Sequence, residues 1–167
     1  WDAIFTSAWR EDGVNWAEAG AGFSRGKAMW TQKMGNSPDQ WEDAFAVSEA
    51  TGVAAIADGA STGIYCRIWA DQLSTTFLAQ RPDTRDPVAL NKWVNGLRTV
   101  WRSAINYSNL NWSKQAKVDQ VGAAATLLGL ELGPSDASGN RPWRACAVGD
   151  ASLFWVRGGK LLASFPV

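Results

Sequence analysis

The chain has 167 residues with 16 acidic and 16 basic side chains, so its formal net charge is zero, and 46% of its residues are hydrophobic. A chain of this length and composition folds around one sizeable core, and its balanced charge argues against disorder and against a nucleic-acid partner held by bulk charge. Histidine is absent, which excludes Ser-His-Asp and Cys-His catalysis and histidine-ligated zinc. Any chemistry must come from carboxylates, hydroxyls, lysine, arginine or the backbone.

The cysteines and the apolar runs indicate in which cellular compartment the protein is expected. Cys66 and Cys146 each lie between apolar neighbours, which favours buried free thiols over a disulfide. The longest uncharged apolar run extends from Val121 to Leu130, and a membrane helix needs about 20 residues. No signal peptide is visible. We therefore expect a cytoplasmic protein with no membrane partner, and the sequence leaves its oligomeric state open.

The N-terminal half of the chain predicts strands followed by a helix. Glycines interrupt the first forty residues, which we interpret as short strands joined by loops. Two apolar runs within 43–57 surround the turn-forming segment 49–52 and predict a β-hairpin. Apolar residues then recur every four positions and predict a helix from Ile64 to Leu78: Tyr65, Trp69, Leu73 and Phe77.

A second helix is predicted from Val88 to Ile105. Asp86 is suited to cap it and Pro87 to occupy its first position. One face carries an apolar stripe: Leu90, Trp93, Val94, Leu97, Val100, Trp101 and Ile105. We expect the two helices to pack antiparallel on one face of a sheet, where they bury Trp69, Phe77, Trp93, Leu97 and Trp101. The polar segment 106–115 is expected to end the second helix.

The C-terminal part returns to strands. Residues 122–132 read as a mostly buried strand, 133–142 as a loop, and 144–149, 152–157 and 160–165 as a three-stranded meander. Gly158 and Gly159 favour a tight turn in the last hairpin because glycine accepts positive φ angles. The order of strands, two helices and strands indicates an α+β layered sandwich and argues against a Rossmann-type alternation.

Acidic residues recur where strands are expected to meet loops. They are Glu42, Asp43, Asp58, Asp119 and Asp150. Carboxylates held at strand ends can share a cleft and bind hard cations such as Mg²⁺ or Mn²⁺ through oxygen. Taken singly, each motif also has a structural explanation, because Asp-Gly is a common turn and a surface acid is common at the start of a strand. The tryptophans are similarly typical of core anchors.

The order of four motifs adds to these signals. WEDAF, VAAIADGAS, GAAATLLGLEL and ACAVGDASLFWVRGGKLL follow one another between about Gln40 and Phe165. In this order and context the sequence resembles the metal-dependent protein serine/threonine phosphatases of type 2C. The resemblance implies a layered β-sandwich of two antiparallel sheets flanked by antiparallel helix pairs. It also implies hydrolysis of phosphoserine and phosphothreonine on phosphoprotein substrates at a centre with two Mn²⁺ or Mg²⁺ ions, which needs no histidine.

The resemblance also implies a set of site residues. Asp58 would bridge the two metal ions and the Gly59 carbonyl would bind one of them. Glu42 and Asp43 would hold metal-bound waters, and Asp150 would lie near a third, weaker metal position. Asp58 and Asp43 are therefore the expected catalytic residues.

Two departures from the family keep other functions open. Relatives place a phosphate-binding arginine five residues before the second acid of the pair, where this chain has Pro38; Arg25, Lys27 and Lys33 are candidates to replace it. Relatives also supply two further metal aspartates after the region of Asp150. We therefore expect residues 1–167 to form a single phosphatase-like domain, incomplete at its C-terminus. The alternatives are a pseudophosphatase or protein-interaction domain of the same fold, and a sugar-binding module with exposed tryptophans.

Overall fold

The computed structural model describes residues 5–9, 29 and 41–166. Seven strands and three α-helices form along this part of the chain, together with a short 3-10 helix at Tyr107–Asn109. In chain order the strands and α-helices are β1 (Phe5–Trp9), β2 (Ala44–Ser48), β3 (Val53–Ala57), α1 (Cys66–Gln80), α2 (Pro87–Ala104), α3 (Trp112–Gln120), β4 (Leu127–Leu132), β5 (Trp143–Val148), β6 (Leu153–Arg157) and β7 (Lys160–Phe165). The secondary structure is a mixture of antiparallel sheets and helices, as the order of the predicted segments indicated.

Five strands form one sheet in the order β1-β5-β4-β3-β2, and every neighbouring pair is antiparallel. The predicted hairpin is confirmed as β2 and β3, with Ala44 paired with Ala57 and Ser48 with Val53. One short strand, β1, is confirmed within the first forty residues; the rest of that segment lies outside the described residues. β6 and β7 form a separate two-stranded sheet.

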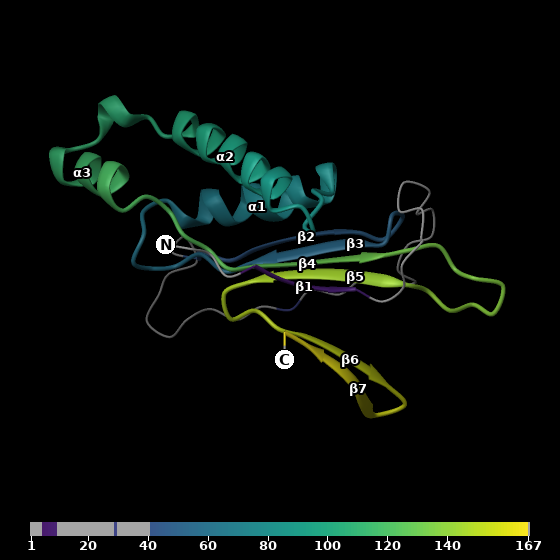
Figure 1. Ribbon diagram of the computed structural model, residues 1–167. Helices are drawn as coiled ribbons and strands as arrows, with labels where there is room; N and C mark the ends of the chain where they lie inside the picture. The colour runs from purple at the N-terminus through teal and green to yellow at the C-terminus, as the bar shows by residue number, and fades with distance from the viewer. Residues whose placement is uncertain (1–4, 10–28, 30–40, 167) are drawn as a thin grey trace.

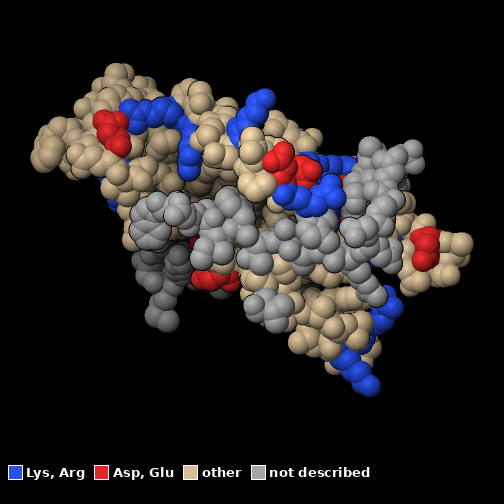
Figure 2. Space-filling view, viewed as in Figure 1, with Lys and Arg blue, Asp and Glu red and all other residues tan. Residues whose placement is uncertain are grey.

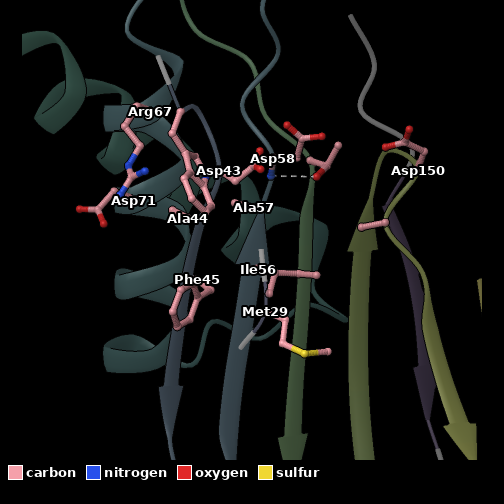
Figure 3. A pocket seen from close by; sticks show the side chains of 13 residues that line it. Met29, Asp43, Ala44, Phe45, Ile56, Ala57, Asp58, Arg67, Asp71 and Asp150 are labelled. Atoms are coloured by element: carbon pink, nitrogen blue, oxygen red, sulfur yellow. Dashed lines mark hydrogen bonds between the residues drawn. The ribbon is translucent and has the colours of Figure 1, made fainter. Parts of the chain in front are cut away.

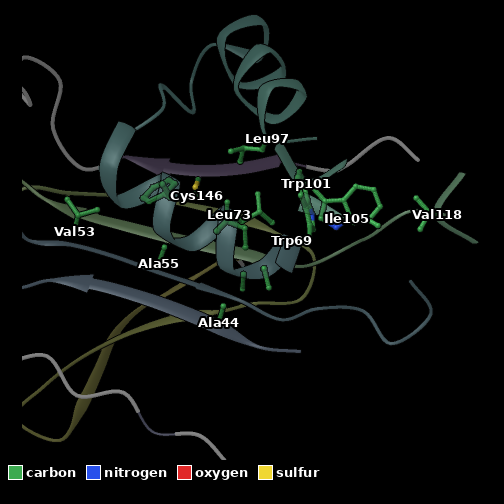
Figure 4. Packing of buried hydrophobic residues seen from close by; sticks show 14 residues of the cluster. Ala44, Val53, Ala55, Trp69, Leu73, Leu97, Trp101, Ile105, Val118 and Cys146 are labelled. Atoms are coloured by element: carbon green, nitrogen blue, oxygen red, sulfur yellow. The ribbon is translucent and has the colours of Figure 1, made fainter. Parts of the chain in front are cut away.

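The main core lies between α1 and one face of the five-stranded sheet. β3 alternates as a half-buried strand should, with Val53, Ala55 and Ala57 buried and Ile56 exposed. α1 packs on β2, β3 and β4 through the predicted stripe, which buries Leu73 and Phe77. Figure 4 shows residues of α1, α2 and the sheet meeting around Leu73. The core therefore fixes the position of α1 against the strands.

α2 begins and packs largely as predicted. The Asp86 side chain accepts a hydrogen bond from the Val88 N–H, and Pro87 is the first helical residue. The Trp101 indole N–H donates to the Tyr65 carbonyl, so the end of α2 meets the start of α1 and the pair is antiparallel. We expected both helices to pack on one face of the sheet, and this is correct for α1 only. α2 packs on the outer side of α1 (Figure 1). For this reason Val100, predicted on the apolar stripe, is exposed and Trp93 is only partly buried.

Three predicted boundaries need correction. The polar segment after α2 continues into α3, whose first turn is capped by the Asn111 side chain accepting from the Lys114 N–H. β4 begins at Leu127, because residues 122–126 bond instead to the loop after β3, as in the Ile64 N–H to Gly122 carbonyl bond. The meander breaks after β5, whose free edge is occupied by β1.

The β6–β7 hairpin lies on the face of the large sheet opposite α1 (Figure 1). Its turn confirms the prediction, with Gly158 and Gly159 at φ 57° and 73°. Phe165 packs there against Leu128, Ala145 and Ala147 in a second buried cluster. The large sheet is thus covered on both faces, by α1 on one and in part by the hairpin on the other.

Both cysteines are buried free thiols, as predicted. Within the described part of the chain, no helix has the length and apolar content needed to cross a bilayer. On the face shown in Figure 2, lysine and arginine side chains are interspersed with acidic ones.

Candidate active site

A cavity of about 810 Å³ opens at one end of the five-stranded sheet. Because neighbouring strands are antiparallel, the starts of β2 and β4 and the ends of β3 and β5 meet at this end. The cavity is lined there by Asp43, Asp58, Thr126 and Asp150 (Figure 3). Three of the predicted site residues therefore share one cavity.

Asp43 and Asp58 flank the last residue pair of the β2–β3 ladder. Ala44 is paired with Ala57, so one further step of the same register places Asp43 opposite Asp58. Side chains directly opposite each other on antiparallel strands have Cβ atoms about 4.5–5.5 Å apart, and like charges in that relation destabilise each other. A cation bound between the two carboxylates would relieve that repulsion.

Asp58 is held by backbone contacts to the neighbouring strand. Its N–H donates to Thr126 Oγ1 at 3.1 Å, and its carbonyl accepts from the Thr126 N–H at 2.8 Å. These reciprocal bonds join the end of β3 to the residue before β4 and leave the Asp58 carboxylate exposed to the cavity. Asp58 is thus positioned by the backbone, and its charge remains available to a ligand.

Asp150 reaches the same cavity through a turn at Gly149. Gly149 has φ 83°, and a Cβ there would lie 2.9 Å from the Thr126 Cγ2. A residue with a side chain would be strained in φ and would also press on Thr126, so glycine suits this position. The turn brings Asp150 over the β4–β5 side of the cavity, across from α1 (Figure 3).

Glu42 and Gly59 lie beside the cavity and are not among its described lining residues. Glu42 Oε2 accepts a hydrogen bond from Ser61 Oγ at 2.7 Å. Gly59 is buried and forms a bridge with Ala125; a Cβ there would lie 2.7 Å from the Glu42 carbonyl oxygen. The two residues therefore pack the loop after β3 against the start of β2.

Asp119, the remaining acid singled out in the sequence, is engaged elsewhere. It accepts a hydrogen bond from the Tyr107 hydroxyl and pairs with Arg102, which ties α3 to α2. The hydrogen bond from Tyr107, and next that from Arg102, lower the pKa of the Asp119 carboxyl.

Burial raises the pKa of the Cys66 thiol, whose Sγ donates to the Ala60 carbonyl. Neither Cys66 nor Asp119 lines the cavity within the described residues.

The cavity also contains residues that the sequence patterns did not single out. Arg67 and Asp71, in the first turns of α1, line one side of it, and Met29, Phe45 and Ile56 form an apolar part of its wall. Arg67 and Asp71 are four residues apart, and a helical wheel of α1 places both on an exposed face, away from the buried stripe. The sequence therefore predicts that these side chains are exposed, but not that they lie beside the strand ends.

The donor chemistry of the cavity fits Mg²⁺ or Mn²⁺. Its donors are carboxylate and hydroxyl oxygens, which these ions prefer, and Mg²⁺ commonly takes one or two carboxylates and keeps several waters. Among the described residues, no three acidic or cysteine side chains converge into a ready-made metal cage. Asp43 and Asp58 are the two carboxylates of the cavity that the β2–β3 register brings opposite each other.

Comparisons of this chain with protein-family models, with curated proteins and with solved structures found no match.

Proposed function

We propose that this chain carries the metal-binding cavity of a domain that hydrolyses phosphoserine and phosphothreonine on proteins with the help of Mn²⁺ or Mg²⁺. One observation carries the proposal: Asp43, Asp58 and Asp150, which are far apart in the sequence, line one cavity at the same end of the sheet. Carboxylate oxygens are the ligands that Mg²⁺ and Mn²⁺ prefer in proteins. Their convergence on one cavity, which Arg67 also lines, supports a bound divalent cation.

Asp58 and Asp43 hold the ions in this proposal, and Asp150 contributes from the opposite side of the cavity. When bound, two such ions lower the pKa of a coordinated water and offset the charge of a phosphate group. The Asp58 backbone is fixed by its bonds to Thr126, and no described cation pairs with its carboxylate. The strand end therefore sets the position of the Asp58 Cα at the cavity, as the rigid elements of a functional site should.

The architecture supports the same proposal. α1 packs on one face of an antiparallel sheet, α2 packs antiparallel on the outer side of α1, and the β6–β7 hairpin lies on the other face of the sheet. We assign this arrangement to the layered sandwich of the type 2C phosphatases.

Binding of Mn²⁺ tests the proposal directly. Isothermal titration calorimetry of the chain with Mn²⁺ should give saturable binding, and Asp58→Asn should weaken it at least about tenfold, because the variant removes a charged ligand and keeps the side-chain shape. Asp86→Asn is the matched control: it removes a carboxylate at the start of α2, outside the cavity, and asparagine caps helices as well as aspartate does.

Hydrolysis of a phosphoserine peptide by the full-length protein provides the second readout. Turnover should require added Mn²⁺ or Mg²⁺, and Asp58→Asn should abolish it. Equal Mn²⁺ affinity in the wild type and in Asp58→Asn, or full turnover by the variant, would overturn the site. A folded chain that binds no Mn²⁺ would leave the non-catalytic interaction domain as the better description.

A further inference from the structure

A positively charged side chain stands among the carboxylates of the cavity. Arg67 lies in the first turn of α1, and it is the one cation among the described lining residues, which include four aspartates. A group of four carboxylates repels a dianion such as phosphate. A protein that binds phosphate here needs positive charge on the same wall, and Arg67 supplies it.

The Arg67 guanidinium is available to a ligand. The side chain is exposed, and within the described residues it forms no ion pair or hydrogen bond with another side chain. Asp71 lies one helical turn further along α1 on the same side of the cavity (Figure 3), and no ion pair joins it to Arg67. Other arginines are engaged, such as Arg102 with Asp119 and Arg144 with Glu131.

We propose that Arg67 is the anion-binding residue of this cavity and holds the phosphate group of a phosphate monoester; this inference rests on the proposed function. Guanidinium is planar and always charged, and its N–H groups match the spacing of phosphate oxygens in a bidentate pair. Arg67 therefore contacts the substrate from the α1 wall, opposite the side on which Asp150 lies.

Asp71 adjusts the strength of this anion site. Its carboxylate is four residues after Arg67 on the same helical face, a spacing at which side chains interact. It therefore attracts the guanidinium and competes with an incoming phosphate. Neutralising Asp71 should strengthen phosphate binding, whereas neutralising Arg67 should weaken it.

Calorimetric titration with inorganic phosphate in the presence of Mg²⁺ tests the assignment. Arg67→Ala should weaken phosphate binding at least about tenfold, Arg67→Lys should retain an intermediate affinity because it keeps the charge but loses the bidentate geometry, and Asp71→Asn should strengthen binding roughly two- to fivefold. Arg98→Ala is the matched control, because Arg98 is exposed on α2 and bonded to Asn95, away from the cavity. The phosphate affinity of Arg98→Ala should equal that of the wild type.

Mn²⁺ titration of the same variants separates this inference from the proposed function. Arg67→Ala should bind Mn²⁺ at least as well as the wild type, since it removes a competing cation. Undiminished phosphate affinity in Arg67→Ala together with normal Mn²⁺ binding would overturn the role of Arg67 alone, as would a wild type that binds Mn²⁺ but not phosphate. A wild type that does not bind Mn²⁺ would instead refute the proposed metal site. Far-UV circular dichroism confirms that each variant is folded.

Discussion

Three acidic residues of this protein have three different roles, and the residues around each carboxylate decide its role. Asp58 has its backbone fixed by Thr126 and its carboxylate facing the cavity. Asp119 is used to hold α3 to α2 through Tyr107 and Arg102. Glu131 is 1% exposed on β4 and pairs with Arg144 and Arg81. Only the first kind of environment leaves a charge free for a ligand.

Glu131 is expected to be critical for stability. Arg144 Nε donates to Glu131 Oε2 at 2.7 Å, and both side chains are largely buried. Glu131→Gln should lower the free energy of unfolding by about 3–5 kcal/mol, because it leaves a buried guanidinium without its counter-charge. Urea unfolding followed by tryptophan fluorescence measures the change.

Asp83→Asn is the control for that measurement. Asp83 pairs with Arg85 on the surface, so its loss should cost no more than about 1 kcal/mol. A cost for Glu131→Gln as small as that of Asp83→Asn would show that the buried pair contributes little.

At the scale of elements, the contact between α1 and β4 is close at one residue, Gly129. The Phe77 ring lies over Gly129, and a Cβ on Gly129 would fall well inside the van der Waals radius of the ring carbons. Gly129 is buried in the middle of β4 and Phe77 is 5% exposed, so neither has room to move. The absence of a side chain at Gly129 therefore sets how closely α1 approaches the sheet.

Gly129→Ala should destabilise the protein by about 1–3 kcal/mol, since the added methyl overpacks the contact with Phe77. Gly96→Ala is a control of the opposite sign. A methyl on Gly96, in α2, would have no heavy atom within 4 Å beyond its own helix backbone, so alanine should stabilise the helix by about 0.5–1 kcal/mol. Thermal unfolding monitored by far-UV circular dichroism checks both variants; a neutral Gly129→Ala would contradict the close packing.

At the scale of the whole molecule, two separate clusters stabilise the two faces of the large sheet. The first, between α1 and the sheet, includes Val53, Leu73 and Trp101. The second, between the sheet and the β6–β7 hairpin, is built around Phe165 and Leu128. The second cluster is smaller, so a single buried aromatic residue contributes a large share of its contacts.

Phe165→Ala should therefore cost about 3–5 kcal/mol of unfolding free energy and detach the hairpin from the sheet. Phe154→Ala on the paired strand is the control, because Phe154 is 63% exposed and its loss should change stability by no more than about 0.5 kcal/mol. Urea unfolding together with hydrogen exchange of the β6–β7 amides distinguishes the two variants. Equal behaviour of the two would show that the hairpin does not depend on the cluster.

Elements whose signals lie within a few residues were predicted from the sequence alone. The β2–β3 hairpin, the four-residue stripe of α1, the Asp86 cap of α2 and the glycine turn before β7 are all confirmed. Each depends on caps, turns or periodicity, which act over one or two turns of chain. α3 was missed because it is polar and buries only Val118, so it has little apolar periodicity to detect.

The sequence by itself also determined which carboxylates follow or precede strands, and hence that Asp43, Asp58 and Asp150 are strand-end residues. Only the tertiary structure decided that these ends coincide, that Asp119 is diverted to Arg102, and that Arg67 faces the same cavity. The bonds between Asp58 and Thr126 join residues 68 positions apart. The pairing of such distant strands depends on the burial of the whole sheet under α1, which no local pattern encodes.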